Sequence, residues 1–192
     1  MNCDMIWEGY YPDTTVHANA EDESHTFSYL VDEVFRDPRV STCLLDPLKE
    51  TFISSADHTA EGYRRLGDVS YPCFTTARGN RVELREGIWN GSEYRGNLKL
   101  INMPVLKHHD GDCGITGAVK NFYGVLSMLD GHRAARHYDQ LGRHCGEMIG
   151  QVRAPVLSIM ACIWGSLTAL SGYAPEATRR LNALLASRDP VA

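Results

Sequence analysis

An almost uninterrupted apolar stretch, residues 98–106, constrains the fold of this 192-residue chain more than any other segment. A run of this kind suits a strand covered on both faces, as in a parallel sheet, because a half-solvated strand would alternate apolar and polar residues. Proline cannot donate to a sheet ladder, so Pro104 predicts that regular pairing ends near Met103. Residues 105–109 are then expected to lead into a polar loop.

Apolar periodicity predicts that helices alternate with buried strands along the rest of the chain. Helices are expected over residues 24–35, from Ser54 or Ser55 through Arg65, over 115–129, over 133–152 and, opened by Pro175, to about Ser187. Strands are expected over residues 40–45, 69–76, 81–89 and 155–163. This alternation indicates an α/β fold with a mostly parallel or mixed central sheet and flanking helices, and a single domain over residues 1–192.

Charge and cysteine spacing exclude several classes of function. The formal net charge is −5, so no basic footprint favours nucleic acid or an anionic membrane as a partner. The six cysteines are scattered without a Cys-x-x-Cys pair, which predicts reduced structural thiols. No apolar run approaches the roughly 20 residues that span a bilayer. The first residues are acidic and resemble no targeting signal, so a cytoplasmic protein is expected.

The polar loop and the segment after it concentrate residues that can bind an anion. Residues 114–121 are predicted to form the amino terminus of a helix, where free backbone N–H groups favour a phosphate or a carboxylate. Lys120 would lie one helical turn beyond the hydroxyl side chain of Thr116. The expected ligand-binding residues are Thr116, Gly117, Lys120 and Asn121.

Two residues before this segment are candidates for proton transfer. In extended backbone, residues two apart point the same way, so Lys107 and His109 are expected to project together. Histidine titrates near neutral pH, and a partly desolvated lysine can become a base. These two residues are therefore predicted to act as general acid and base or as electrostatic stabilisers. The competing interpretation is a solvated lysine at a strand end followed by loop histidines.

Two further interpretations of the same segment stay open. Gly117 and Gly124 would also allow close packing against another helix without any ligand. Residues 108–113 crowd five potential metal ligands into a compact loop: His108, His109, Asp110, Asp112 and Cys113. Neighbouring side chains in such a loop rarely converge on one ion, so a solvated acidic turn is favoured and no metal is expected.

The segment INMPVLKHHDGDCGITGAVKNFYGVLSM, residues 101–128, resembles the signature of an uncharacterised prokaryotic family called domain of unknown function 362. Members read roughly N-x-P-x-x-K-x-H, followed by T-G-x-x-K-N-x-x-G on a helix. Further similarity comes from YRRLG upstream and from APVLSIMACIWG and LLASRDPVA downstream. The resemblance therefore covers roughly residues 56–192.

Two departures limit what the resemblance implies. Members usually begin with a strand bearing a lysine-proline-asparagine element and continue beyond the D-P-V-A motif, so this chain resembles an incomplete domain. Many members also carry a carboxy-terminal ferredoxin-like module with iron–sulfur clusters, whose cysteine spacing is missing here. No cofactor is therefore expected in this chain, and an iron–sulfur cluster only in a missing module or a ferredoxin-type partner.

Three functional hypotheses follow. The first is an enzyme, or a fragment of one, that binds a small anionic metabolite and transfers a proton beside a carboxylate. The second is a non-catalytic binding or electron-transfer accessory module whose iron–sulfur part lies elsewhere. The third is a metal-loop protein. The sequence identifies neither the substrate nor the oligomeric state.

Overall fold

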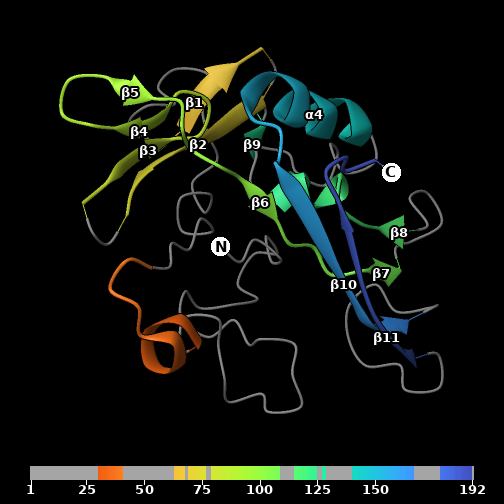
Figure 1. Ribbon diagram of the computed structural model, residues 1–192. Coiled ribbons are helices and arrows are strands. Elements are labelled where there is room, and N and C mark those ends of the chain that lie inside the picture. The colour runs from red at the N-terminus through yellow and green to blue at the C-terminus, as the bar shows by residue number, and fades with distance from the viewer. Residues whose placement is uncertain are drawn as a thin grey trace, which may run out of the picture. The chain divides into compact units, whose positions relative to one another are not determined.

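The computed structural model describes residues 30–40, 63–67, 69–76, 79–108, 115–124, 127–128, 140–166 and 178–191 (Figure 1). The chain divides into two compact units, one of residues 1–97 and 127–131 and the other of residues 98–126 and 132–192. Each unit is described by itself. Within the described part of the chain, no helix combines the length and the apolar character needed to cross a bilayer.

The first unit is built on a six-stranded antiparallel sheet that also includes β9. Five strands pair in the order of the sequence: β1 (Tyr63–Leu66), β2 (Val69–Thr75), β3 (Arg81–Glu83), β4 (Gly87–Trp89) and β5 (Tyr94–Arg95). β9 (Ser127–Met128) pairs with the first residues of β2. The unit also contains η1 (Leu30–Phe35), a short π-helix.

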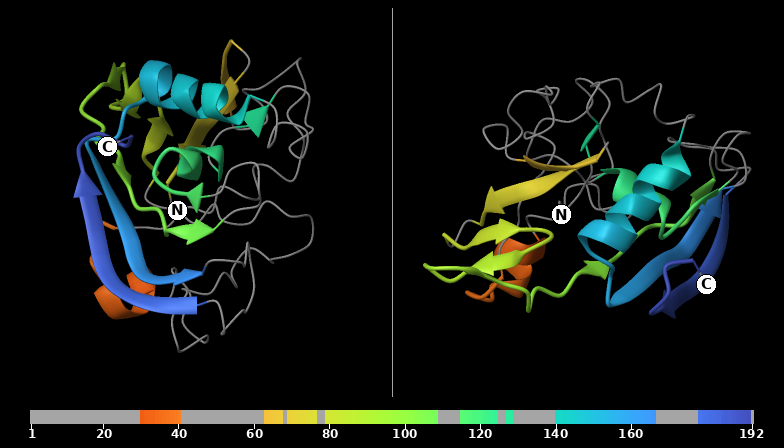
Figure 2. Two further views of the ribbon diagram at one scale, coloured as in Figure 1. Left: turned by 90° about the vertical axis from the view of Figure 1, so that its right-hand side faces the viewer. Right: turned by 90° about the horizontal axis from the view of Figure 1, so that it is seen from above.

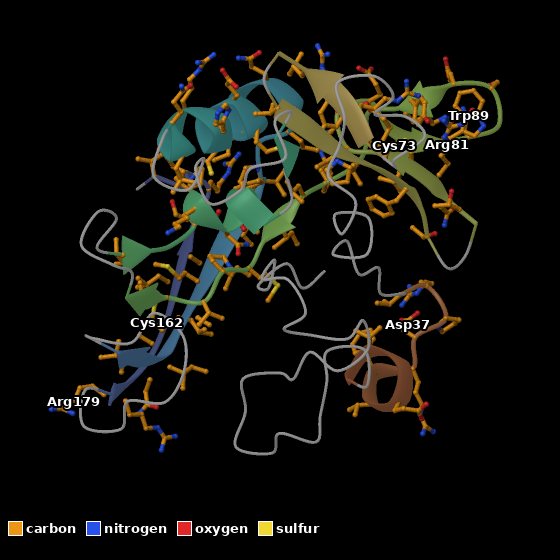
Figure 3. All side chains as sticks on the ribbon, turned by 180° about the vertical axis from the view of Figure 1, so that it is seen from behind. Asp37, Cys73, Arg81, Trp89, Cys162 and Arg179 are labelled. Atoms are coloured by element: carbon orange, nitrogen blue, oxygen red, sulfur yellow. The ribbon has the colours of Figure 1, made fainter. Side chains whose placement is uncertain are left out.

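Aromatic and cationic side chains meet on the β3–β5 part of this sheet. The rings of Trp89 and Tyr94 pack edge to face with their centroids 5.1 Å apart. The guanidinium carbon of Arg81 lies 5.9 Å from the centroid of the Tyr94 ring. Figure 3 labels Arg81 and Trp89, together with Cys73 on the neighbouring strand β2. These contacts hold the outer strands of the meander together.

Polar residues are buried in the same unit beside apolar ones. Tyr71 and Glu83 are both almost fully buried, next to Val69, Val82 and Leu84. Burial raises the pKa of the Tyr71 phenol well above its usual value of 10.0, and a side-chain hydrogen bond with Glu83 raises it further. The neutral phenol is therefore the form that the folded protein stabilises.

This shift predicts a loss of stability at alkaline pH. The unfolded chain releases the Tyr71 proton near pH 10, whereas the folded chain keeps it, so the free energy of unfolding falls as pH rises above about 10. The free energy of unfolding should fall by about 1.4 kcal/mol per pH unit, which corresponds to the release of one proton on unfolding. Urea denaturation at pH 8 to 11 would measure it. Tyr71→Phe should show a shallower slope, and equal slopes in both proteins would contradict the assignment.

The second unit contains a three-stranded mixed sheet with the order β11-β10-β6. β6 (Ile101–Asn102) runs parallel to β10 (Leu157–Ser166), and β11 (Thr178–Ser187) runs antiparallel to β10. Figure 2 shows β10 and β11 side by side and bent along their length. The mixed sheet agrees with the expected fold class. The described residues are rich in strands and contain few helices. They do not show the expected layers of helices flanking the sheet.

One helical segment of the second unit packs inward. α4 (Leu141–Glu147) continues directly into η3 (Met148–Val152), a π-helical turn. Four of their residues are buried: His144, Cys145, Met148 and Val152. On the exposed side, Arg143 Nε lies 3.0 Å from a carboxylate oxygen of Glu147. This confirms the described part of the helix expected over residues 133–152.

Two expected helices are wrong. The described residues of 115–129 form β8 (Ile115–Thr116), the 3-10 helix η2 (Lys120–Gly124) and, in the first unit, β9, in place of one long helix. The helix that Pro175 was expected to open is wrong too, because residues 178–187 form β11 and pair with β10.

The expectations for the remaining segments divide as follows. The strands expected over residues 69–76 and 155–163 are confirmed as β2 and β10. The single strand expected over residues 81–89 is two strands, β3 and β4, with a turn at 84–86. The helix expected to run through Arg65 is wrong there, because β1 begins at Tyr63. Most of the segments expected over 24–35 and 40–45 lie outside the described residues; η1 covers 30–35 and Val40 is not in a strand.

Candidate functional site

The candidate site begins where β6 lies beside β10. Leu157 pairs with Ile101 and Ser158 with Asn102 in parallel register. Pairing continues beyond Asn102, because the Pro104 carbonyl accepts a hydrogen bond from the backbone N–H of Ala161 at 2.9 Å. Pro104 lacks a donor but keeps its acceptor, so it interrupts the ladder without ending it. Regular pairing therefore ends near Met103, as predicted, and an isolated bridge between Val105 and Ala161 follows it. The expectation that this stretch is covered on both faces is wrong, because Ile101 is 52% exposed and Met103 is 69% exposed.

Asn102 is the polar centre of this region. It is only 5% exposed, and its side-chain Nδ2 donates to the backbone carbonyl of Ala118 at 2.9 Å. Its Oδ1 accepts a hydrogen bond from Asn121 Nδ2 at 2.7 Å. Nδ2 also lies 3.4 Å from the hydroxyl of Ser158, which is 4% exposed. One side chain thus connects β6, β10 and the segment that enters η2.

The same hydrogen bonds explain why the long helix does not form. The Ala118 carbonyl, which would accept a bond from residue 122 in an α-helix, is bound by Asn102. The Phe122 N–H bonds the Val119 carbonyl three residues back, at 3.2 Å, as in a 3-10 helix. Phe122 is buried and anchors this short turn, while α4 packs against η2. A five-residue 3-10 helix contributes little of the dipole expected at a helix amino terminus.

Lys120 is the first residue of η2. Lys120 as a whole is half-buried, and its ammonium nitrogen is shielded from solvent. Asn121 follows directly and is also half-buried. Of the four predicted ligand-binding residues, Asn121 therefore contacts Asn102, and Lys120 directly precedes it in the chain.

The other predicted residues are placed by the backbone. β7 (Lys107–His108) pairs antiparallel with β8, and Lys107 lies opposite Thr116 in the register. A Cβ atom at Gly117 would lie 3.4 Å from the Met160 sulfur on β10, an ordinary contact distance, and this neighbour belongs to a strand and not to another helix. His109 lies outside the described residues, as does most of the candidate metal loop.

No metal site emerges from the residues that the structure covers. Among them, no group of three or more His, Cys, Asp or Glu side chains could hold an ion. The described cysteines Cys73, Cys145 and Cys162 are not disulfide-bonded. Burial raises the pKa of the Cys162 thiol, which favours its protonated and unreactive form.

Sequence reasoning missed Asn102 and Ser158 as members of the site. The signal for Asn102 is present in the sequence, because it is the one amide inside the apolar stretch of residues 98–106. Asparagine is disfavoured in strands and costly to bury without partners, so its presence there calls for specific hydrogen bonds. Ser158 gives no comparable signal, since its role depends on the non-local pairing of β10 with β6.

Comparison with known proteins identifies a family. A sequence model of the family described as Domain of unknown function (DUF362) matches residues 88–192, slightly more than half of the chain. This match covers the second unit, including β6, η2 and β10, and it confirms the resemblance drawn from the sequence motifs. It begins after β3, so the YRRLG motif lies outside it. No curated protein and no solved structure matches the chain.

Proposed function

The chain belongs to the family described as Domain of unknown function (DUF362), and from that premise we propose that it binds a small anionic metabolite where β6 meets η2. The observation that carries the proposal is the position of Lys120. Its ammonium nitrogen is shielded from solvent, and the next residue in the chain, Asn121, is hydrogen-bonded to Asn102. A cation removed from water attracts an anion more strongly, because the effective dielectric constant around it is lower.

Within this proposal the residues have separate roles. Lys120 supplies the positive charge, and the Asn121 carboxamide supplies hydrogen-bonding groups beside it. Thr116 and Gly117 complete the binding segment. Lys107, opposite Thr116 in the β7–β8 register, and His109 act as general acid and base for proton transfer beside a carboxylate.

The competing proposal is a binding or electron-transfer accessory module without catalysis of its own, which works with a ferredoxin-type partner. Both proposals require an anionic ligand or partner group at Lys120. They differ at Lys107, because an accessory module has no need of a general acid or base there. Measuring anion binding at Lys120 therefore tests both proposals together.

Replacing Lys120 should abolish most of the affinity for anions. We expect Lys120→Met to weaken binding of inorganic phosphate or malonate at least tenfold, about 1.4 kcal/mol, because methionine keeps the length of the side chain but removes its charge. Isothermal titration calorimetry would measure the affinities.

Lys99→Met is the matched control. Lys99 is an exposed lysine of the same unit, so its replacement changes the net charge equally and should leave the affinity unchanged. Equal weakening in both variants would show a general charge effect. Unchanged affinity in Lys120→Met, or a wild-type protein that binds neither anion at millimolar concentration, would refute the proposal.

A further inference from the structure

We propose that Asn102 is the positioning residue of this site, and that it fixes Lys120 by binding the chain on both sides of it. The inference rests on the proposed anion site, which it deepens. Asn102 binds the backbone carbonyl of Ala118, two residues before Lys120, and the side chain of Asn121, one residue after it. The segment that carries the lysine is therefore held at two points by a single buried side chain.

The hydrogen bonds of Asn102 permit one orientation of its carboxamide. A backbone carbonyl can only accept, so the group that faces the Ala118 oxygen must be the NH₂ of Asn102. The carboxamide oxygen then faces Asn121, and this oxygen can only accept. Asn121 must therefore direct its own NH₂ toward Asn102. The orientation of Asn121, beside Lys120, is thus set by a backbone group on the other side of the lysine.

The surroundings of Asn102 indicate why this position holds an amide. The neighbouring residues in the sequence are apolar, and asparagine is disfavoured in strands relative to β-branched and aromatic residues. Burying an amide is favourable only when its donors and acceptor find partners, which they do here on η2 and on β10. The amide lowers the strand propensity of this position, and its hydrogen bonds fix the segment that carries Lys120.

The test measures the position of Lys120 and the affinity of the site independently. Reductive methylation of the native protein, quantified by mass spectrometry, reports how accessible the Lys120 nitrogen is, with the exposed Lys99 as internal reference. We expect Asn102→Leu to accelerate modification of Lys120 at least tenfold relative to Lys99. It should also weaken phosphate binding at least tenfold, because the ammonium no longer stays in place.

Three further variants make the result specific. Ser158→Ala removes only the longest contact of Asn102, at 3.4 Å, so both readouts should stay within about threefold of the wild type. Val152→Ala destabilises the same unit from a buried position that takes no part in these hydrogen bonds and should change neither readout. Asn121→Ala removes one of the two attachments without altering the sheet. It should shift both readouts in the direction of Asn102→Leu, and it replaces that variant if the leucine prevents folding.

The outcomes separate the inference from the proposed function. Faster modification of Lys120 with weaker phosphate binding supports both. Faster modification in a protein whose wild type binds no phosphate supports the positioning role and refutes the anion site. Loss of binding in Lys120→Met with no change in either readout for Asn102→Leu and Asn121→Ala overturns the inference alone. Weaker binding with unaltered Lys120 modification, or equal changes in Val152→Ala, overturns it as well.

Discussion

Replacing Gly87 with alanine should unfold the first unit or reduce its stability severely. Gly87 opens β4 with a φ of +115°, which L residues rarely adopt. A Cβ atom at this position would come 1.9 Å from the Arg95 carbonyl oxygen and 2.6 Å from its carbonyl carbon. Both atoms belong to the backbone of the strand that pairs with β4, so only separation of β4 and β5 would relieve the clash. We expect a loss of more than about 3 kcal/mol in the free energy of unfolding.

Gly91→Ala separates the steric clash from the backbone strain. Gly91 has a similar φ of +108°, but nothing lies within 4 Å of the position its Cβ would take. Its replacement should cost only about 1 to 2 kcal/mol, the strain of the backbone alone. Urea denaturation followed by circular dichroism would compare the two variants. Similar losses at both glycines would show that the close approach of Arg95 has no energetic weight.

Truncating Met148 should have the second largest effect. Its side chain is fully buried where α4 passes into η3. Methionine and alanine both have high helix propensity, so the substitution changes the core and hardly affects the backbone. Removing a buried side chain of this size costs the transfer free energy and leaves a cavity, so Met148→Ala should lose about 2 to 5 kcal/mol.

Met103→Ala is the corresponding control within the same unit. Met103 follows β6 and is 69% exposed, so truncation removes the same atoms from solvent-facing positions. We expect a change below about 0.5 kcal/mol. The urea midpoints of both variants and of the wild type, measured at one pH, would give the difference. A loss at Met148 no larger than at Met103 would contradict the assignment of Met148 to the core.

The elements that sequence reasoning predicted are those whose signal is local. β2 and β10 are short runs rich in apolar, aromatic or β-branched residues, and the end of the 133–152 helix carries an apolar stripe of its own. β11 shows the limit of this reasoning. Its sequence, TRRLNALLAS, favours a helix by propensity, and Leu184 remains 66% exposed in the strand. Burial does not explain that strand; its pairing with β10 does, and pairing is not encoded locally.

Of residues 116–121, Asn121 is hydrogen-bonded to Asn102 on β6. Sequence reasoning placed ligand-binding residues in this segment, and their role in binding stays a prediction. It attributed the anion-binding geometry to a helix amino terminus, whereas the structure has a 3-10 turn held by Asn102. The hydrogen bond from Asn102 to the Ala118 carbonyl competes with helix formation. The hydrophobic periodicity of residues 115–129 cannot indicate this bond, because Asn102 lies outside that segment.

The contact between Asn102 and Ser158 joins residues 56 positions apart. A ribosome adds about 5 to 20 residues per second, so roughly 3 to 11 seconds pass between the synthesis of Asn102 and that of its partner on β10. Throughout that interval the nascent chain carries β6 without the strand that pairs with it. Unpaired strand edges make partly made chains prone to aggregation. The contact between Asn102 and Ser158 therefore forms late, after the greater part of this unit has been made.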